Sequence, residues 1–296
     1  MDNIFKKLTQ IEQVNFLLTN RIPRNLVTVL VGWFSKIENP LVAKLSIGVW
    51  KLFADDLKLE EAKQTQFKSM HDCFIRELKE GVRPINQDSE IVASPCDALI
   101  GAHGCIEGTT VFQAKGFPYD INDLIPDQQL TKKLEYGYFV TLRLQSSMYH
   151  RFHAPIDCTV SDVNYISGDT WNVNPIALKR VEQLYCKNER AYIELKTGLD
   201  EHFMVLVPVA AILVASMQFN CLNEPLHLKY KGPNKIPCHG GYDKGDEMGY
   251  FQHGSTIILF TSSQYQMIET LKTGDRINMG EALLKRIHIK PTGELL

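Results

Sequence analysis

FQHGSTIILF, residues 251–260, places a polar Gly-Ser turn directly before a run of β-branched and apolar residues. This pattern predicts a buried strand that begins near residue 256. Gly254 allows unusual backbone geometry and leaves its own carbonyl open, so the Ser255 hydroxyl has access to the preceding peptide bond. A Gly-Ser pair before a strand is ordinarily only a turn. The stretch by itself therefore leaves two interpretations open, a turn or a self-processing serine.

Short runs rich in β-branched and aromatic residues recur after Pro84, and Gly, Asn, Asp and Pro separate them. The predicted strands are 90–92, 138–144, 159–165, 190–195, 203–217 and 256–260. No long helical pattern alternates with them, which disfavours a doubly wound parallel sheet. We therefore expect a mainly β fold, an antiparallel sandwich or barrel-like core, with a short helix and loop at 119–135. Residues 273–283 predict a strand-turn-strand element.

The first 80 residues have a helical pattern instead. Leu26, Leu30 and Trp33 recur at helical spacing, and residues 41–53 repeat the pattern after a break near Pro40. Tryptophans interspersed with lysines are typical of a helix in a bilayer interface, although a helix packed on the core has a similar pattern. The predicted organisation is a helical membrane-contacting region, 1–80, before a β-rich core, 81–296, which makes the whole chain α+β.

The charge is unevenly distributed along the 296 residues. The whole chain carries −2, whereas residues 1–51 hold seven Lys or Arg against three Asp or Glu, leaving −6 for the remainder. No overall attraction to nucleic acid follows, but an anionic membrane surface is a candidate partner of the basic start. Residues 25–35, the longest uncharged run there, fall short of the ~20 needed to span a bilayer. No secretory signal is visible, so we expect a soluble or peripheral protein.

Seven cysteines without a CxxC pair indicate a reducing compartment and argue against a disulfide scaffold. His150 and His153 suit zinc ligation, acid–base chemistry or local structural hydrogen bonds. No HExxH or CxxC partner accompanies them, so no metal is expected. Asp97 is ordinarily a turn residue unless it meets a histidine. Residues 113–116 and 244–249 are interpreted as solvated turns.

Several segments, taken in order, resemble the phosphatidylserine decarboxylase family, whose members depend on a pyruvoyl group. Any one segment is weak, but their order and spacing along nearly the whole chain are specific. The segments are FIREL (74–78), RPI (83–85), PCD (95–97), QAKG (113–116), YHRFH (149–153), KGDEMG (244–249), GST (254–256) and MGE (279–281).

The resemblance implies a role for each matching residue. Ser255 is the self-processing serine that attacks the Gly254 carbonyl, with His153 as base and Asp97 orienting it. β-Elimination from the resulting ester, followed by hydrolysis, leaves a pyruvoyl group at position 255. His150 matches the histidine assigned to decarboxylation, as a proton donor to the carbanion.

The implied products are a β chain, 1–254, and an α chain, 255–296, which stay associated. The implied activity is conversion of phosphatidylserine to phosphatidylethanolamine and carbon dioxide through a Schiff base, in which the pyruvoyl ketone is the electron sink. Expected partners are phosphatidylserine in an anionic membrane and a second αβ unit in a homodimer, with no nucleic acid. The expected location is peripheral, on the cytoplasmic side of the cell membrane.

Three features depart from the family pattern: His253 before the Gly-Ser pair, Ala98 after the aspartate, and a glycine-poor stretch at 203–217. None removes a catalytic group, so they bear on processing rate and pocket shape. Three alternatives remain open: a pyruvoyl decarboxylase of a soluble amino acid, a lipid-binding module without catalysis, and a metal-dependent hydrolase built on the two histidines.

Overall fold

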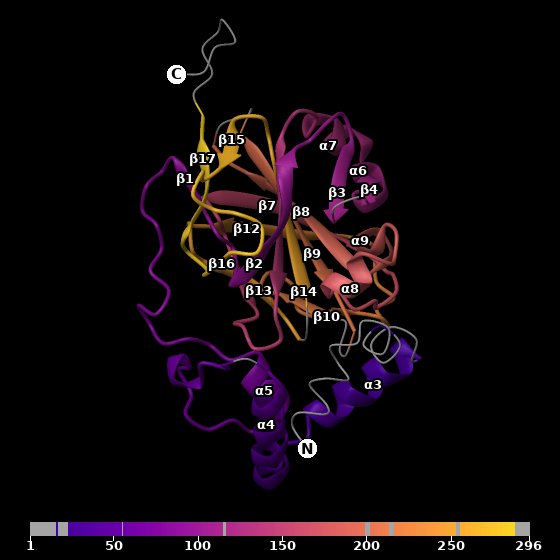
Figure 1. The fold of residues 1–296 in the computed structure, drawn as a ribbon, viewed down its shortest axis with the longest axis vertical. Coiled ribbons are helices and arrows are strands. Elements are labelled where there is room, and N and C mark those ends of the chain that lie inside the picture. Colours follow the sequence, from indigo (N-terminus) through magenta and orange to yellow (C-terminus); the bar gives the residue numbers. More distant parts are fainter. Residues whose placement is uncertain are drawn as a thin grey trace, which may run out of the picture.

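Strands dominate the chain from Ile91 onward in the computed structural model (Figure 1), and every pair of named strands is antiparallel. The structure describes residues 16, 23–54, 56–114, 117–198, 202–212, 216–252 and 255–287. An eight-stranded sheet has the order β12-β7-β8-β9-β14-β5-β2-β16. Its strands are β2 (Ala98–Cys105), β5 (Tyr138–Leu144), β7 (Cys158–Ile166), β8 (Arg190–Lys196), β9 (Phe203–Ala210), β12 (Lys235–Tyr242), β14 (Ser255–Thr261) and β16 (Arg276–Ile277).

Three smaller sheets accompany the large one. Their orders are β11-β10-β13-β6, β1-β17-β15 and β3-β4. Their strands are β1 (Ile91–Ala93), β3 (Thr110–Ala114), β4 (Phe117–Asp120), β6 (Arg151–His153), β10 (Ser216–Phe219), β11 (Leu226–His227), β13 (Glu247–Phe251), β15 (Tyr265–Met267) and β17 (Ala282–Arg286). Because β12 and β16 are separate edges of the large sheet, the described strands form an open sandwich and not a closed barrel.

Strand β14 shows how the two faces of the large sheet are buried. Side chains alternate between faces along a strand, and Ile257 and Leu259 belong to one core cluster while Ile258 and Phe260 belong to the other. The first cluster includes Phe152, Phe219 and Phe251 of the four-stranded sheet. The second lies under the short helices α6 (Ile121–Leu124), α7 (Gln128–Lys133), α8 (Pro175–Leu178) and α9 (Leu184–Lys187). The molecule is thus layered as sheet, sheet and helices.

Most of the predicted strands are confirmed, and β5 has the predicted bounds. Residues 203–217 are an exception, since β9 ends at Ala210 and β10 begins at Ser216 in a different sheet. The 273–283 element does contain two strands, but β16 pairs with β2 whereas β17 pairs with β1 and β15. The two strands are close in the sequence but belong to different sheets, because they pair with different strands.

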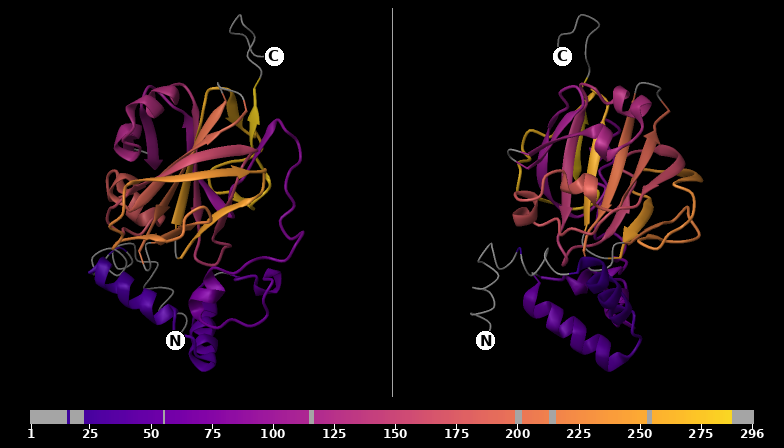
Figure 2. Two further views of the ribbon diagram at one scale, coloured as in Figure 1. Left: turned by 180° about the vertical axis from the view of Figure 1, so that it is seen from behind. Right: turned by 90° about the vertical axis from the view of Figure 1, so that its right-hand side faces the viewer.

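Helices α3 (Arg24–Ser35) and α4 (Pro40–Phe53) lie at one end of the β-rich body, with α5 (Met70–Phe74) between α4 and the sheets (Figures 1 and 2). A short 3₁₀ helix, Leu59–Glu61, follows α4. Asn39 caps α4 by accepting from the amides of Leu41 and Val42, which explains the break near Pro40. No described helix is long and apolar enough to cross a bilayer. The boundary at residue 80 stays a prediction.

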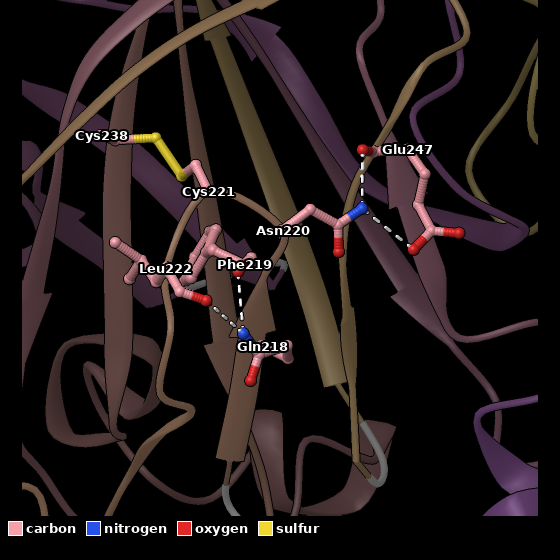
Figure 3. The surroundings of a disulfide bond; sticks show 7 residues. All are labelled: Gln218, Phe219, Asn220, Cys221, Leu222, Cys238 and Glu247. Atoms are coloured by element: carbon pink, nitrogen blue, oxygen red, sulfur yellow. Dashed lines mark hydrogen bonds between the residues drawn. A yellow bond between two sulfur atoms is a disulfide. The ribbon is translucent and has the colours of Figure 1, made fainter.

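One pair of cysteines corrects the expectation of a chain without disulfides. Cys221, in the turn after β10, is bonded to Cys238 of β12 (Figure 3). The same turn is held by Asn220, whose side-chain amide donates to the main-chain carbonyl of Glu247 at 2.9 Å. The remaining five cysteines are free thiols. The bond joins the four-stranded sheet to the edge of the large one.

Candidate functional site

Ser255 is the first residue of β14 and lies in the middle of the large sheet. In the backbone register it is opposite Leu144 of β5 on one side and Ala210 of β9 on the other. Its side chain is completely buried, and its hydroxyl has no hydrogen-bond partner among the described residues. A buried hydroxyl without a partner is costly, which makes this serine a candidate for chemistry. His253 and Gly254 lie outside the described residues.

Ser255 also lines a cavity of about 420 Å³ at the end of the strands. The other residues of its wall are Phe74, Arg143, Leu144, Gln145, Ser146, Asn172, Val173, Asn174, Pro175, Ala211 and Ile212. Phe74 belongs to α5, so the cavity lies where the amino-terminal helices meet the sheet. Its mixture of apolar and amide side chains suits a small ligand with both polar and apolar parts.

His150 is connected to this cavity through Phe74. The two rings pack with centroids 4.0 Å apart, and the imidazole is buried. The Nδ1 of His150 lies 2.8 Å from the carbonyl oxygen of Met148. A carbonyl only accepts, so Nδ1 carries the proton and Nε2 the lone pair. The His150 carbonyl in turn accepts from the Phe251 amide at 3.0 Å, four residues before Ser255.

His153 has a partner at each ring nitrogen. Its Nδ1 donates to the Gly245 carbonyl at 2.8 Å, and its Nε2 accepts from the Tyr149 hydroxyl at 3.0 Å. Burial lowers the pKa of His153, although the Gly245 hydrogen bond acts in the opposite direction. A lowered pKa keeps the imidazole neutral near pH 7, which is the form that accepts a proton.

Residues 244–249 are only in part the solvated turn that was expected, because residues 244–245 form a turn whereas Glu247 begins strand β13. Gly245 has φ +95°, and a side chain there would approach Ile85 to 2.8 Å. Glu247 receives two hydrogen bonds from the Arg151 guanidinium, at 2.8 and 2.9 Å. Arg151 also donates to the Ile75 carbonyl after α5. The segment thus binds His153 through the Gly245 carbonyl. It also contacts Arg151 of β6, which reaches the Ile75 carbonyl in the helical region.

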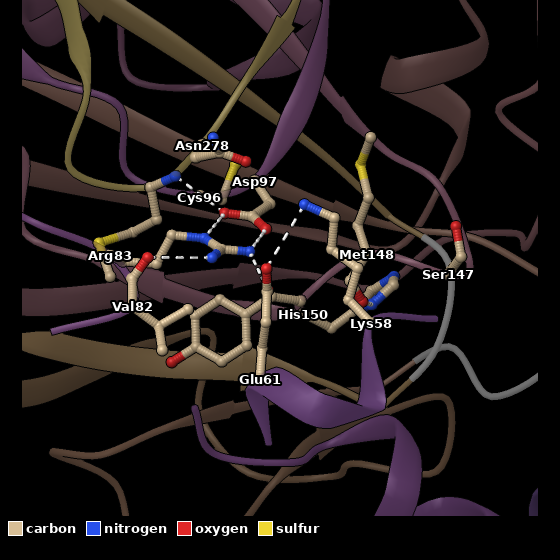
Figure 4. Close-up of polar contacts among 12 residues, drawn as sticks. Lys58, Glu61, Val82, Arg83, Cys96, Asp97, Ser147, Met148, His150 and Asn278 are labelled. Carbon is tan, nitrogen blue, oxygen red and sulfur yellow. Dashed lines mark hydrogen bonds and ion pairs between the residues drawn. The ribbon is translucent and has the colours of Figure 1, made fainter. Parts of the chain in front are cut away.

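Asp97 is buried, and its carboxylate is bound by Arg83 (Figure 4). Arg83 Nε donates to Oδ1 at 2.9 Å and Nη2 donates to Oδ2 at 2.6 Å. The Met279 amide donates to Oδ1 as well, at 2.9 Å, and Arg83 also contacts Glu61. Burial opposes the charged form of Arg83, but these two carboxylates raise its pKa above the ordinary value.

The structure brings the predicted residues together differently from the sequence interpretation. Asp97 does not hydrogen-bond to His153, because Gly245 and Tyr149 occupy both ring nitrogens. The expected contact in which Asp97 directly orients His153 is thus replaced by the contact of Asp97 with Arg83. Arg83 stands in the RPI segment that the resemblance included, but no local pattern predicts that it pairs with Asp97.

Gln113 corrects a second turn assignment. Its side chain is buried and donates to the carbonyls of Leu178 and Val181 at 2.9 and 2.8 Å. Its carbonyl oxygen accepts from the Leu184 amide. Gln113 therefore fixes the segment from α8 to α9, whose beginning forms part of the cavity wall. Lys115 and Gly116 lie outside the described residues.

Arg143 was also missed by the sequence interpretation, although a signal existed. It is the single charged residue in YFVTLRL, the otherwise uncharged strand β5, and it lines the Ser255 cavity. Within the described ranges, no cluster of three or more His, Cys, Asp or Glu is arranged to hold a metal ion.

Comparison with known proteins gives consistent matches. The family described as "Phosphatidylserine decarboxylase" matches residues 70–285. A phosphatidylserine decarboxylase proenzyme of Haemophilus influenzae (strain 86-028NP) is 34% identical over 277 residues, covering 88% of this chain and 92% of the relative. The proenzyme of Pasteurella multocida is 33% identical over 299 residues, covering 95% and 98%. That of Shewanella sp. is 34% identical over 258 residues, covering 84% and 88%.

Proposed function

The chain belongs to the phosphatidylserine decarboxylase family, and from this membership we propose that it is a proenzyme of a carboxy-lyase. The mature enzyme converts phosphatidylserine to phosphatidylethanolamine and carbon dioxide in phospholipid biosynthesis. The observation that carries the proposal is the buried Ser255 hydroxyl at the start of β14. It has no hydrogen-bond partner among the described residues, and it lies in the wall of a cavity beside the His150–Phe74 pair.

The residues at this position fit a pyruvoyl group made from Ser255. The serine is buried in a cavity wall, and its hydroxyl makes no competing hydrogen bond to a described residue. Such a group supplies a ketone that withdraws the electron pair released when carbon dioxide leaves. No soluble cofactor is then needed.

Formation of the group requires cleavage between Gly254 and Ser255, giving a β chain, 1–254, and an α chain, 255–296. Strand β14 is paired along its whole length with β5 and β9. These two ladders and the apolar residues of β14 hold the α chain in the sheet after the peptide bond is broken. The two products therefore stay associated.

Cleavage begins with attack of the Ser255 hydroxyl on the Gly254 carbonyl. An ester bond forms, the peptide C–N bond breaks, and the hydroxyl proton passes by way of a base to the released amine. We assign the base to His153, which its lowered pKa keeps neutral. Because Tyr149 occupies the Nε2 lone pair, its hydroxyl either relays the proton or releases this hydrogen bond. Asp97 acts as a positioning residue, through Arg83 and the Met279 amide.

His150 is assigned to the second reaction, the decarboxylation. It takes up a proton on Nε2 and delivers it to the carbon from which carbon dioxide has left, while Nδ1 keeps its hydrogen bond to Met148. Its packing against Phe74 puts it beside the cavity, and the Met148 carbonyl fixes its ring orientation and tautomer. A single fixed tautomer suits a residue that carries a proton to one substrate atom.

We further propose that α3 and α4 rest on the membrane. Their apolar side chains are exposed, including Trp33 at 69% and Leu45 at 61%, and Lys36, Lys44 and Lys51 are also exposed. Apolar residues with neighbouring lysines suit the interface of an anionic bilayer. We accordingly propose a peripheral location on the cytoplasmic side of the cell membrane. The expected assembly is a homodimer of αβ units.

The rival function is decarboxylation of a soluble amino acid by the same chemistry. The exposed apolar helices disfavour it, because a soluble substrate does not need a membrane-binding surface. Carbon dioxide release from phosphatidylserine vesicles, compared with release from free serine, separates the two.

The test of self-processing is an intact-mass measurement. The wild type should give a carboxy-terminal fragment that begins at residue 255 and lacks its α-amino group, whereas Ser255→Ala should remain one full-length chain without activity. Ser262→Ala is the matched control, since Ser262 is another buried hydroxyl without a described partner, just beyond the other end of β14. Cleavage of the Ser255→Ala protein at this bond would refute the proposal.

A further inference from the structure

Arg143 carries a positive charge one register position from the processing serine. On β5 it lies opposite Thr256, and Leu144 lies opposite Ser255. Its side chain is half-buried, and in the described part of the chain no hydrogen bond or ion pair holds the guanidinium. Arg76 and Arg190 differ, since these buried arginines donate to main-chain carbonyls at several positions. Among the described residues, hydrogen bonds therefore hold the guanidinium groups of Arg76 and Arg190 but not that of Arg143.

Two cavities meet at Arg143. One is the 420 Å³ cavity that contains Ser255, and the other, of about 530 Å³, is lined by Gln113, Lys179 and Tyr185 among others. No aspartate or glutamate is present among the described residues that line either cavity. Amide side chains of Gln145 and Asn172 complete the polar wall near Ser255. The two cavities that share Arg143 are therefore lined by a positive charge and, among the described residues, by no negative charge.

A guanidinium in this setting favours an anionic ligand. Burial lowers the pKa of Arg143, but arginine stays protonated in proteins. A charge removed from water without a counterion is costly, and an incoming anion removes that cost. The planar fork of arginine matches the paired oxygens of a phosphodiester or a carboxylate.

The proposed substrate, phosphatidylserine, has both a phosphodiester and a carboxylate, and the two groups change differently during the reaction. The carboxylate loses its charge as carbon dioxide forms, so a cation bound to it would stabilise the substrate more than the transition state and slow the reaction. The phosphodiester keeps its charge in substrate, transition state and product. Resting on the proposed function, we propose that Arg143 binds the phosphodiester of the phospholipid headgroup and thereby positions the amine and carboxylate at residue 255.

The Ser255→Ala protein allows the test without covalent chemistry, in the uncleaved state that the structure describes. Binding of dihexanoyl phosphatidylethanolamine and dihexanoyl phosphatidylserine is measured by calorimetry. Arg143→Gln should weaken both lipids at least ~10-fold, since a charge-assisted hydrogen bond is lost, and Arg143→Lys should weaken them less. Arg276→Gln, an exposed arginine of the edge strand β16, is the matched control and should change neither.

A second measurement needs no substitution of Arg143 and so does not depend on the folding of the variants. Dihexanoyl phosphatidylethanolamine should protect Arg143 from phenylglyoxal, whereas dihexanoyl glycerol, which lacks the phosphodiester, should not. Weakened binding of phosphatidylserine alone would assign Arg143 to the carboxylate and overturn the proposal. Unchanged binding of both lipids, or unprotected Arg143, would also overturn it.

Failure of the proposed function gives a different result. In that case the wild type releases no carbon dioxide from phosphatidylserine, while phosphatidylethanolamine binding still depends on Arg143. An active wild type whose lipid binding is indifferent to Arg143 leaves the function standing and removes this inference.

Discussion

The Asp97 carboxylate is held by the Arg83 guanidinium through two hydrogen bonds, at 2.9 and 2.6 Å, and both side chains are buried. A bidentate pair in a low-dielectric setting is rigid. It fixes the backbone on two sides, since the Met279 amide binds the same carboxylate. On this geometry we propose that Asp97 supports the site by fixing the backbone around it.

The first prediction follows from this pair. Arg83→Gln and Asp97→Asn should each lower the free energy of unfolding by about 3 kcal/mol, because removing one partner leaves the other charge buried. Denaturant unfolding of both variants in the Ser255→Ala background, where cleavage does not interfere, measures this. Lys63→Gln breaks an exposed pair with Glu77 and should cost less than about 1 kcal/mol.

The same two substitutions in the chain that keeps Ser255 test how Asp97 affects self-cleavage. Both should slow self-cleavage to a similar extent, as followed by the appearance of the 255–296 fragment. If only Asp97→Asn slows cleavage while Arg83→Gln cleaves normally, Asp97 acts on a histidine directly and the positioning role is wrong.

The second prediction separates the two reactions. His150→Ala should still cleave at Ser255, but carbon dioxide release should fall by about 100-fold or more, the usual range for loss of a general acid. Fragment mass and radiolabelled carbon dioxide report the two steps independently. His239→Asn, a change at an exposed histidine of the edge strand β12 whose positive φ Asn tolerates, is the control. Normal turnover of the His150 variant would remove its assigned role.

The third prediction concerns pH. Because burial lowers the pKa of His153 below its ordinary value of 6.5, the neutral imidazole persists into more acidic solution than a free imidazole does. Self-cleavage should therefore keep more than half of its maximal rate at pH 6.5 and decline as the pH falls further. An NMR titration of His153 in the Ser255→Ala protein gives the pKa directly, and a value above 6.5 would contradict the expected sign.

The fourth prediction tests the membrane surface. Trp33→Ser and Leu45→Ser should each weaken binding to anionic vesicles by about 10-fold, since each removes a large side chain from the interface. Co-sedimentation with vesicles measures this. The control is Tyr136→Asn, which removes an exposed aromatic ring outside the two helices, and Asn tolerates the positive φ of that position. Equal binding by all four proteins would rule out α3 and α4 as the contact.

Local patterns were enough to locate most of the strands. Residues 138–144 form β5 as predicted, because an apolar, β-branched run bounded by polar residues has few other ways to be buried. The prediction of one strand over 203–217 was wrong. A continuous apolar pattern does not show where β9 ends and where β10 begins in another sheet. The ordered motifs likewise indicated the family, which the comparisons bear out.

By itself, then, the sequence determined where strands and helices form, which family the chain joins, and which residues were candidates for chemistry, because these depend on short-range pattern and residue type. The tertiary structure alone decided the partners: Asp97 with Arg83, His153 with Gly245, and Cys221 with Cys238. These contacts join segments that are distant in the sequence or in different sheets. Only the packing of the sheets and the helical region sets such distances, and no local pattern encodes them.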